Sequence, residues 1–500
     1  MPWPEPHATD TEVICMPRHA RTPLRSRLQR NRRTVAATAA TAALVITGVL
    51  TPALTAPSAE DLPRRTGAIQ RLPQIGEHDR THDQHAKQAQ RAKRETPSRH
   101  AQRARTTTAP AKATTARKVV KGKPTAADRT IAAKLRTRIK NDQLGAKVTG
   151  HVGDVDSGRA VWSADGHHAM MPASTTKVGT AVAALKALGP DHKLTTDVRL
   201  EDRTITLVGG GDELLTSGDL SALAAKTARQ VRKRTPYRLQ VDDSLFAQPS
   251  MSPGWSGGYY PGNVTPVRAL VVDQHQVMDT AIDAGHVFAH ELRERGVKVA
   301  DVRRAKASEE ATSVAAHRTP VSEVVIQMLL YSDNDLAESL QRLTAVELGR
   351  PATWRGGVQA QMKVFRDLGV DTRGMRLFDG SGLSRADRIS AANLVSILQA
   401  AYTKGRHTTM WPLKKGLPLA GATGTLDDSY GRFVTPQSYR AAGKVRGKTG
   451  SLHDVITLAG VTRGADGRMK AYAFMQNGAP SSLSIRQGFD GLAATVHGSW

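Results

Sequence analysis

Ser174 and Lys177 stand three residues apart at the start of a segment with helical periodicity. Residues three apart on a helix share a face, so the Lys177 amine can take the proton of the Ser174 hydroxyl. The positive end of the helix dipole favours negative charge at this point. The pair predicts a nucleophilic serine with a lysine base. Taken alone, Ser-x-x-Lys fits a helix-capping serine beside an exposed lysine equally well.

A second pair of polar residues, Ser332 and Asn334, lies in the sequence Tyr-Ser-Asp-Asn. Residues 321–330 before it are strongly apolar and predict a buried helix. Asp335–Glu338 after it resembles a capping box that starts the next helix. Ser332 and Asn334 are therefore expected on a tight loop between two helices, where their side chains can point into a cleft. Ser-x-Asn alone is also explained by simple helix capping.

The third group is Lys448-Thr449-Gly450, followed by Ser451. Strand-like runs at residues 455–461 and 470–475 follow it, which predicts a strand of an antiparallel sheet. A glycine in such a strand permits close approach of another backbone, such as a bound peptide. The helix that carries Lys177 is expected to end at Gly189-Pro190.

In this order, Ser-x-x-Lys, Ser-x-Asn and Lys-Thr-Gly resemble the signature of penicillin-binding proteins and serine β-lactamases. The chain is most similar in pattern to the D-alanyl-D-alanine carboxypeptidases/endopeptidases, the low-molecular-weight class C penicillin-binding proteins. Further segments of residues 126–500 support this resemblance: Met171–Lys177, Leu207–Asp212, Asp379–Ser384 and Ala420–Leu426. It implies an α/β fold of the α+β type, with an antiparallel sheet flanked by helices, a helical subdomain and a smaller inserted domain.

The resemblance also implies a catalytic role for each residue of the first two motifs. Ser174 would attack the carbonyl of a D-Ala-D-Ala peptide bond, with Lys177 as general base. Ser332 would relay the proton to the leaving amine. Asn334 would bind the amide on the acyl side of the substrate and help to place Lys177.

For the third motif, the resemblance implies substrate binding along the strand that contains Gly450. Lys448 would supply positive potential, and Thr449 would bind the terminal carboxylate of the substrate. The backbone N–H groups of Ser174 and Ser451 would form the oxyanion hole. The chemistry requires no metal and no cofactor. The nearest approach to a zinc-protease helix, residues 290–294, has Glu294 where the second histidine would stand.

Composition divides the chain into a basic N-terminal part and a folded remainder. Residues 1–125 contain 23 Lys and Arg against 9 Asp and Glu, within a net charge of +26 for the whole chain. Residues 1–59 predict a basic leader, with an apolar stretch at Ala42–Leu50 that suits a signal peptide or a membrane anchor. Residues 60–125 are poor in large apolar side chains and predict a disordered spacer.

The folded remainder is expected to split into a catalytic domain and an insertion. Ser174 and Ser332 are 158 positions apart, which is too many for a β-lactamase. We therefore expect the catalytic domain at residues 126–191 and 317–500, interrupted by an inserted domain at 192–316. The leader predicts export to the cell envelope, either secreted or anchored to the membrane through the leader alone.

The partners expected are the stem peptides of peptidoglycan, with β-lactams as inhibitors. The basic spacer at 60–125 suits anionic wall polymers, or no partner at all. Nucleic acid is not expected, because the excess charge lies in a low-complexity tail and only 4% of residues are aromatic. The one cysteine, Cys15, precedes the apolar stretch and excludes a disulfide framework.

Two other functions compete with a D,D-peptidase. One is a serine β-lactamase, although no Glu-x-x-x-Asn pattern is found for its deacylating glutamate. The other is a cell-wall-binding protein without catalysis, which the intact set of serines, lysines and asparagine disfavours. The sequence leaves open whether carboxypeptidase or endopeptidase activity dominates.

Overall fold

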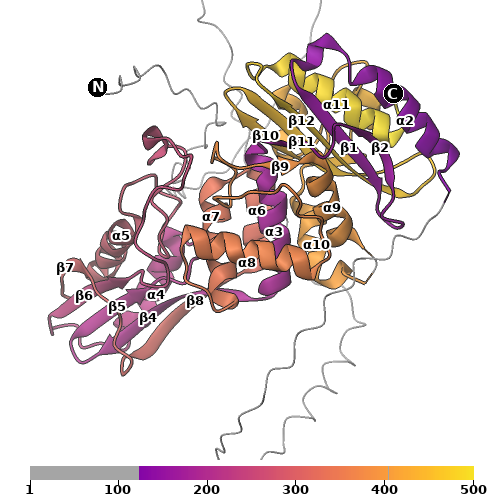
Figure 1. The fold of residues 1–500 in the computed structure, drawn as a ribbon. Coiled ribbons are helices and arrows are strands. Elements are labelled where there is room, and N and C mark those ends of the chain that lie inside the picture. Colours follow the sequence, from indigo (N-terminus) through magenta and orange to yellow (C-terminus); the bar gives the residue numbers. More distant parts are fainter. Residues whose placement is uncertain (1–122, 404) are drawn as a thin grey trace, which may run out of the picture. The chain divides into compact units, whose positions relative to one another are not determined.

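The fold is seen in a computed structural model that describes residues 123–403 and 405–500 (Figure 1). The expected leader (1–59) and all but the last three residues of the expected spacer (60–125) lie outside the described residues. No helix within the described ranges has the length and apolarity needed to cross a bilayer.

The main sheet is antiparallel and has the strand order β10-β11-β12-β1-β2. Its strands are β1 (Val148–Asp154), β2 (Ala160–Ala164), β10 (Val445–Leu452), β11 (Val455–Arg463) and β12 (Met469–Asn477). The two runs predicted as strands after the Lys-Thr-Gly motif are β11 and β12, so that prediction is confirmed. In the register of the sheet, Lys448 lies opposite Ala459 and Gly450 lies opposite Thr457. The motif therefore occupies a strand at the edge of the sheet.

Alternation along β11 and β12 buries both faces of this sheet. Tyr472 and Phe474 point to a core with α2 (Ala126–Arg138) and α11 (Leu483–His497), which lie over one face in Figure 1. Ala471 and Met475 point to the other face, which α9 (Ala391–Tyr402) covers. Burial on both faces explains why these strands are almost continuously apolar.

A helical subdomain carries the first two motifs. It contains α3 (Thr176–Ala187), α6 (Val321–Tyr331), α7 (Asn334–Glu347), α8 (Trp354–Asp367) and α10 (His407–Gly416). The first ten residues of α3 are all buried, which its Ala and Val content permits. α3 ends as expected, with Gly189 at a φ of +87°. The buried helix expected at 321–330 is α6.

The second large sheet mixes parallel and antiparallel pairs in the order β7-β6-β5-β4-β8. Its strands are β4 (Lys193–Glu201), β5 (Thr204–Val208), β6 (Tyr237–Asp242), β7 (Val299–Arg304) and β8 (Thr312–Pro320), with helices α4 (Ser217–Ala228) and α5 (Thr280–Glu294). It encloses its own apolar core around Leu207, Leu239 and Phe288. The extent of the inserted domain stays a proposal at 192–316; β8 itself continues to Pro320.

Short elements join these layers. A two-stranded ladder pairs β3 (Ala169–Met170) with β9 (Ile389–Ser390) just before the nucleophile motif. The single-turn 3-10 helices are η2 (Asp142–Leu144), η3 (Ala173–Thr175), η4 (Gly257–Tyr259), η5 (Gly424–Leu426), η6 (Asp428–Tyr430) and η7 (Tyr439–Ala441). With the layers already described, the observed architecture confirms the predicted fold class.

Candidate active site

The turn that carries Ser174 is tied to the end of the main sheet. Ser174 lies in η3, directly before α3, and is half-buried. The Pro172 carbonyl accepts hydroxyl hydrogen bonds from Thr175 at 2.6 Å and from Thr457 of β11 at 2.7 Å. The Met171 amide donates to Oδ1 of Asn477, at the end of β12, at 2.9 Å. Side chains of two strands thus fix the turn at the two residues that shortly precede the serine.

Lys177 is fully buried, and three oxygen atoms surround its amine. Lys177 Nζ donates to Ser174 Oγ at 2.9 Å, to Asn334 Oδ1 at 2.7 Å and to the Ser381 carbonyl at 2.8 Å. A buried amine is stable only when its polar hydrogens find such partners. The three contacts also fix the direction of the amine, with one of them on the predicted nucleophile.

The loop between α6 and α7 consists of only Ser332 and Asp333. Ser332 adopts a left-handed conformation with φ of +62° and ends α6. Asn334 is already the first residue of α7 and is buried. Its amide Nδ2 donates to the Asn263 carbonyl at 2.8 Å, so the Asn334 oxygen is turned toward Lys177. The expected tight loop is present, with Asn334 just inside the helix.

The expected capping box at Asp335–Glu338 is wrong. The residue that caps α7 is Asp333, which accepts the Leu336 amide at 3.1 Å. Asp335 instead accepts both the amide and the hydroxyl of Thr265, at 2.7 and 2.8 Å. Glu338 accepts backbone amides of the loop at residues 379–384. In the sequence the two acids resemble a local helix cap. In the structure they accept hydrogen bonds from segments that are distant in the chain.

Lys448 connects the strand motif to the loop motif. It is fully buried, and its amine donates to Ser332 Oγ at 2.8 Å and to the Thr449 carbonyl at 2.8 Å. The Thr449 hydroxyl donates to the hydroxyl of Thr425, in η5, at 2.8 Å. Ser332, Thr449 and Ser174 are half-buried, whereas the two lysines are fully buried. The accessible surface of the site is therefore made of hydroxyl groups, with the two lysine amines behind them.

Gly450 is required for contact between β10 and the nucleophile turn. A Cβ atom added there would lie 2.2 Å from Thr457 Oγ1, 2.8 Å from the Pro172 carbonyl oxygen and 3.0 Å from the Ser174 amide nitrogen. The sequence suggested that this glycine permits close approach of another backbone, such as a bound peptide. The backbone that approaches it in the structure is the protein's own turn at Pro172 and Ser174. Ser451 follows it and is half-buried.

The structure thus brings all eight predicted site residues together from three separated parts of the chain. The sequence matches the D-Ala-D-Ala carboxypeptidase 3 (S13) family over residues 131–279 and 274–496. The chain belongs to this S13 family. The predicted resemblance is confirmed, and with it the enzyme class, a serine-type D-Ala-D-Ala carboxypeptidase.

Individual relatives agree with this assignment. Carboxypeptidase DacB of Mycolicibacterium smegmatis is 34% identical over 401 residues, which cover 75% of this chain and 85% of the relative. A D-alanyl-D-alanine carboxypeptidase of Actinomadura is 26% identical and covers 67% of this chain and 78% of its own. The crystal structure of penicillin-binding protein 4 from Haemophilus influenzae shares the fold, with a TM-score of 0.64, 21% identity and coverage of 73% of this chain and 99% of that one.

In this S13 chain, several groups around the predicted residues escaped sequence reasoning. They are the carbonyls of Ser381 and Asn263, the hydroxyl of Thr425 and the carboxylate of Glu338. Ser381 and Thr425 lie in segments that resemble the family in sequence, but those segments carry no catalytic signature of their own. A backbone carbonyl has no side-chain signature, so no residue pattern could have assigned the carbonyl contacts of Ser381 and Asn263.

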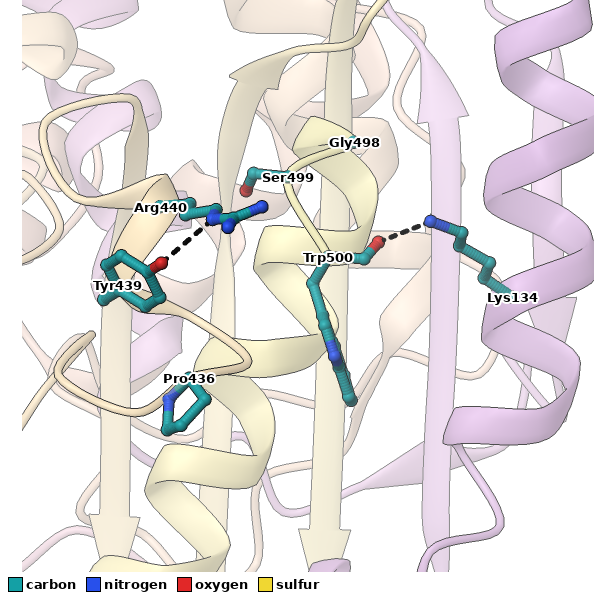
Figure 2. A pocket seen from close by; sticks show the side chains of 7 residues that line it. All are labelled: Lys134, Pro436, Tyr439, Arg440, Gly498, Ser499 and Trp500. Carbon is teal, nitrogen blue, oxygen red and sulfur yellow. Dashed lines mark hydrogen bonds between the residues drawn. The ribbon is translucent and has the colours of Figure 1, made fainter.

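A separate surface pocket of about 560 Å³ lies between α2, η7 and the residues after α11 (Figure 2). Lys134 Nζ donates to the Trp500 carbonyl at 2.9 Å, and the Arg440 Nε donates to the Tyr439 hydroxyl at 3.0 Å. The Arg138 guanidinium stacks on the Trp500 ring at 3.7 Å. None of the motif residues lines this pocket, so it is not the reaction centre of the S13 enzyme.

Proposed function

We propose that this chain hydrolyses D-alanyl peptide bonds of peptidoglycan through an acyl-enzyme on Ser174. The observation that carries the proposal is the hydrogen bond of 2.9 Å between Ser174 Oγ and the buried amine of Lys177. Two further acceptors, Asn334 Oδ1 and the Ser381 carbonyl, hold that amine in place. Nucleophile and base within hydrogen-bond reach, with the base oriented by other groups, is the arrangement that covalent catalysis requires.

In the acylation step, Ser174 Oγ attacks the carbonyl carbon of the D-Ala-D-Ala bond, and neutral Lys177 takes the hydroxyl proton. The tetrahedral intermediate places its negative charge on the former carbonyl oxygen, between the amides of Ser174 and Ser451. A preorganised donor of this kind contributes about 3–4 kcal/mol. Collapse breaks the C–N bond; Ser332 gives its hydroxyl proton to the departing amine of D-alanine and takes in its place the proton that Lys177 accepted from Ser174, which leaves Lys177 neutral again. The bond from Lys448 to Ser332 supports this role by orienting the hydroxyl.

The same residues bind the substrate. The terminal carboxylate of the peptide lies against the Thr449 hydroxyl, with Lys448 supplying positive charge behind it. Asn334 binds the amide on the acyl side. β10 is an edge strand, so an extended peptide can add to it by backbone hydrogen bonds along the segment with Gly450.

Water then attacks the ester carbonyl, which releases the shortened peptide and returns the proton to Ser174. A β-lactam acylates the same serine, but its ring-opened product keeps the amine attached and hinders this step. Carboxypeptidase and endopeptidase reactions share this chemistry and differ only in the group on the leaving side of the scissile amide. We further propose that the enzyme acts outside the membrane and that the spacer, outside the described residues, binds anionic wall polymers.

Release of D-alanine from a peptide that ends in D-Ala-D-Ala tests the proposal. We expect steady release by the wild type and a loss of at least about 1,000-fold in kcat for Lys177→Ala, because the base is removed. Nitrocefin is the comparison substrate. Rapid turnover of nitrocefin without release of D-alanine would contradict the proposal and favour a β-lactamase, and inactivity toward both would favour a binding protein.

A further inference from the structure

The carbonyl that accepts a hydrogen bond from Lys177 belongs to a buried loop. Two carboxylates accept hydrogen bonds from the backbone amides of this loop. This loop, residues 379–384, supplies the Ser381 carbonyl at 2.8 Å from Lys177 Nζ. Oδ1 of Asp379 accepts the Gly382 amide at 2.8 Å, and Oε1 of Glu338 accepts the Ser381 amide at 2.8 Å. Both carboxylates are fully buried. Two buried acids, neither of which contacts the nucleophile, are thus connected to the base.

A single peptide group links Lys177 to Asp379. The Ser381 carbonyl and the Gly382 N–H belong to the same amide, so Lys177 donates to its oxygen while its N–H donates to Asp379. Hydrogen bonds in series polarise one another, and a carboxylate on the N–H makes the carbonyl a stronger acceptor. Asp379 therefore acts on the amine of Lys177 through a single planar group.

Local geometry leaves this amide little freedom. Gly382 has a φ of +82°, and a Cβ atom added to it would lie 1.9 Å from the Ala173 carbonyl oxygen. The other oxygen of Asp379 accepts the Ser384 amide and the indole N–H of Trp255, both at 2.7 Å. Three donors on one buried carboxylate fix its position.

The charged groups around the loop come from α7 and from the loop's own continuation. Burial, reinforced by the charge of Asp379, raises the pKa of Glu338 to about 7. Burial and Asp379 also raise the pKa of Asp387 well above its usual range. The counter-charge is Arg342, whose pKa burial lowers to about 10 and whose guanidinium stacks on Trp354 at 3.8 Å. Glu338 and Asp387 thus take up protons more readily than ordinary carboxyl groups, in part because Asp379 is beside them.

We propose that Asp379 is a positioning residue for Lys177, acting through the peptide group between Ser381 and Gly382, with Glu338 fixing the two preceding amides. The inference rests on the proposed function, in which Lys177 is the base. Asp379 holds the carbonyl on the lysine amine and increases the negative charge on its oxygen. It therefore orients the amine and stabilises its protonated form relative to the neutral one.

The test is the rate constant of acylation by a penicillin, measured by stopped flow from about pH 5 to 9. In Asp379→Asn, we expect the plateau rate to fall about 10- to 100-fold because orientation is lost. The acid limb should move to lower pH by about 0.5 to 1 unit, because the protonated amine loses stabilisation. Loss of structural support alone would lower the plateau without moving the limb.

Ser384→Ala is the matched control. Ser384 is a buried residue of the same loop whose hydroxyl donates to the Pro253 carbonyl at 2.6 Å and does not contact Asp379 or Lys177. We expect its acid limb to coincide with that of the wild type. An Asp379→Asn profile with an unmoved limb would overturn the inference, whereas a wild type that no penicillin acylates would overturn the proposed function instead.

Glu338→Gln provides a second variant if Asp379→Asn does not fold. It neutralises the carboxylate on the amides of Gly380 and Ser381 but leaves the bond from Gly382 to Asp379 intact. The inference predicts a shift of the acid limb in the same direction but smaller than about 0.5 unit, with retained secondary structure. A folded Glu338→Gln enzyme with an unmoved limb would also overturn it.

Discussion

The two buried lysines of the site differ in the partners that surround them. The Lys177 amine contacts the Ser174 hydroxyl, a side-chain amide oxygen and a backbone carbonyl. The Lys448 amine contacts the Ser332 hydroxyl and the backbone carbonyl of the residue that follows Lys448. Lys177 lies within hydrogen-bond reach of Ser174 and can exchange a proton with it directly. Lys448 is placed to hold positive charge next to Ser332. In the proposed mechanism, the same residue type therefore serves as base on one side of the site and as a fixed positive charge on the other.

Thr425 offers a prediction at this scale. Its hydroxyl lies 2.8 Å from that of Thr449, so both can donate to one bound carboxylate. In Thr425→Val, we expect KM for a D-Ala-D-Ala peptide to rise about 5- to 10-fold with kcat within about twofold, as for the loss of one hydrogen bond. Steady-state kinetics give both constants. A C-terminally amidated peptide is the control, and an equal rise in KM for that substrate would contradict a carboxylate contact.

Elements position the site by approaching one another closely at glycines. β10 approaches the turn before α3 at Gly450, and the loop at 379–384 approaches it at Gly382. These contacts join segments that lie about 200 or more positions apart in the chain. The sheet therefore supplies the geometry of the nucleophile as much as the helix that begins there.

Gly450→Ala tests this arrangement. The added methyl group would lie 2.8 Å from the Pro172 carbonyl oxygen and 3.0 Å from the Ser174 amide nitrogen, so β10 must shift relative to Ser174. We expect acylation by a penicillin to fall at least about 100-fold, as for a displacement of about 1 Å at a reaction centre. Gly257→Ala is the control, because no atom lies within 4 Å of its added Cβ. Acylation of Gly450→Ala within about threefold of the wild-type rate would refute the close approach.

The sequence predicted the elements well where a pattern is local and less well where contacts are distant. Apolar periodicity located α3 and α6, and strand-like runs located β11 and β12 beside the Lys-Thr-Gly motif. The capping box at Asp335 was misread because a carboxylate near a helix start has the same sequence signature whether it caps that helix or binds Thr265. The Ser381 and Asn263 carbonyls were missed because any residue type can supply a carbonyl.

The described molecule is also held together by buried charge on the far side of the main sheet from α9. Lys470 is fully buried, and its amine contacts Asp128 at 2.7 Å, Asp154 at 3.0 Å and Asp466 at 3.1 Å. Asp128 also pairs with Arg159 and closes the capping box of α2 with Thr125. This cluster links α2, the first described helix, to β1 and β12.

The cluster predicts a loss of stability in acid. Burial alone would raise the pKa of Asp128, but hydrogen bonds from Lys470, the Thr125 amide and Arg159 outweigh it and lower the pKa to about 2. A lowered pKa stabilises the folded state above the unfolded value of 3.8, and this contribution is lost as pH falls through about 2. Asp128→Asn should lower the free energy of unfolding at pH 7 by about 2–3 kcal/mol.

Urea unfolding at a series of pH values measures this effect. The difference between Asp128→Asn and the wild type should shrink as pH falls from about 4 to 2. Asp367→Asn is the control, because that half-exposed carboxylate pairs with Lys363 at the surface and should contribute under about 0.5 kcal/mol. A difference for Asp128→Asn that is the same at every pH would rule out a charge effect.

At the scale of the whole molecule, the order of motifs was sufficient to predict the family and the fold class. Ser174, Lys177, Ser332, Asn334 and Lys448 converge because the catalytic fold places a helix, a loop and an edge strand side by side. The sequence could not predict the mixed sheet of β4–β8 or the contact of Asn263 with Asn334. No sequence motif indicates how the segment between the first two motifs folds or which of its residues reach the site.

The central claim is that Ser174 is the nucleophile, and labelling with a fluorescent penicillin tests it most directly. The wild type should give a covalent band of near one label per molecule, and Ser174→Ala should give none under the same conditions. Ser322→Ala, a buried serine of α6, should label as the wild type does. A band that persists in a folded Ser174→Ala variant would contradict the assignment and place the nucleophile elsewhere.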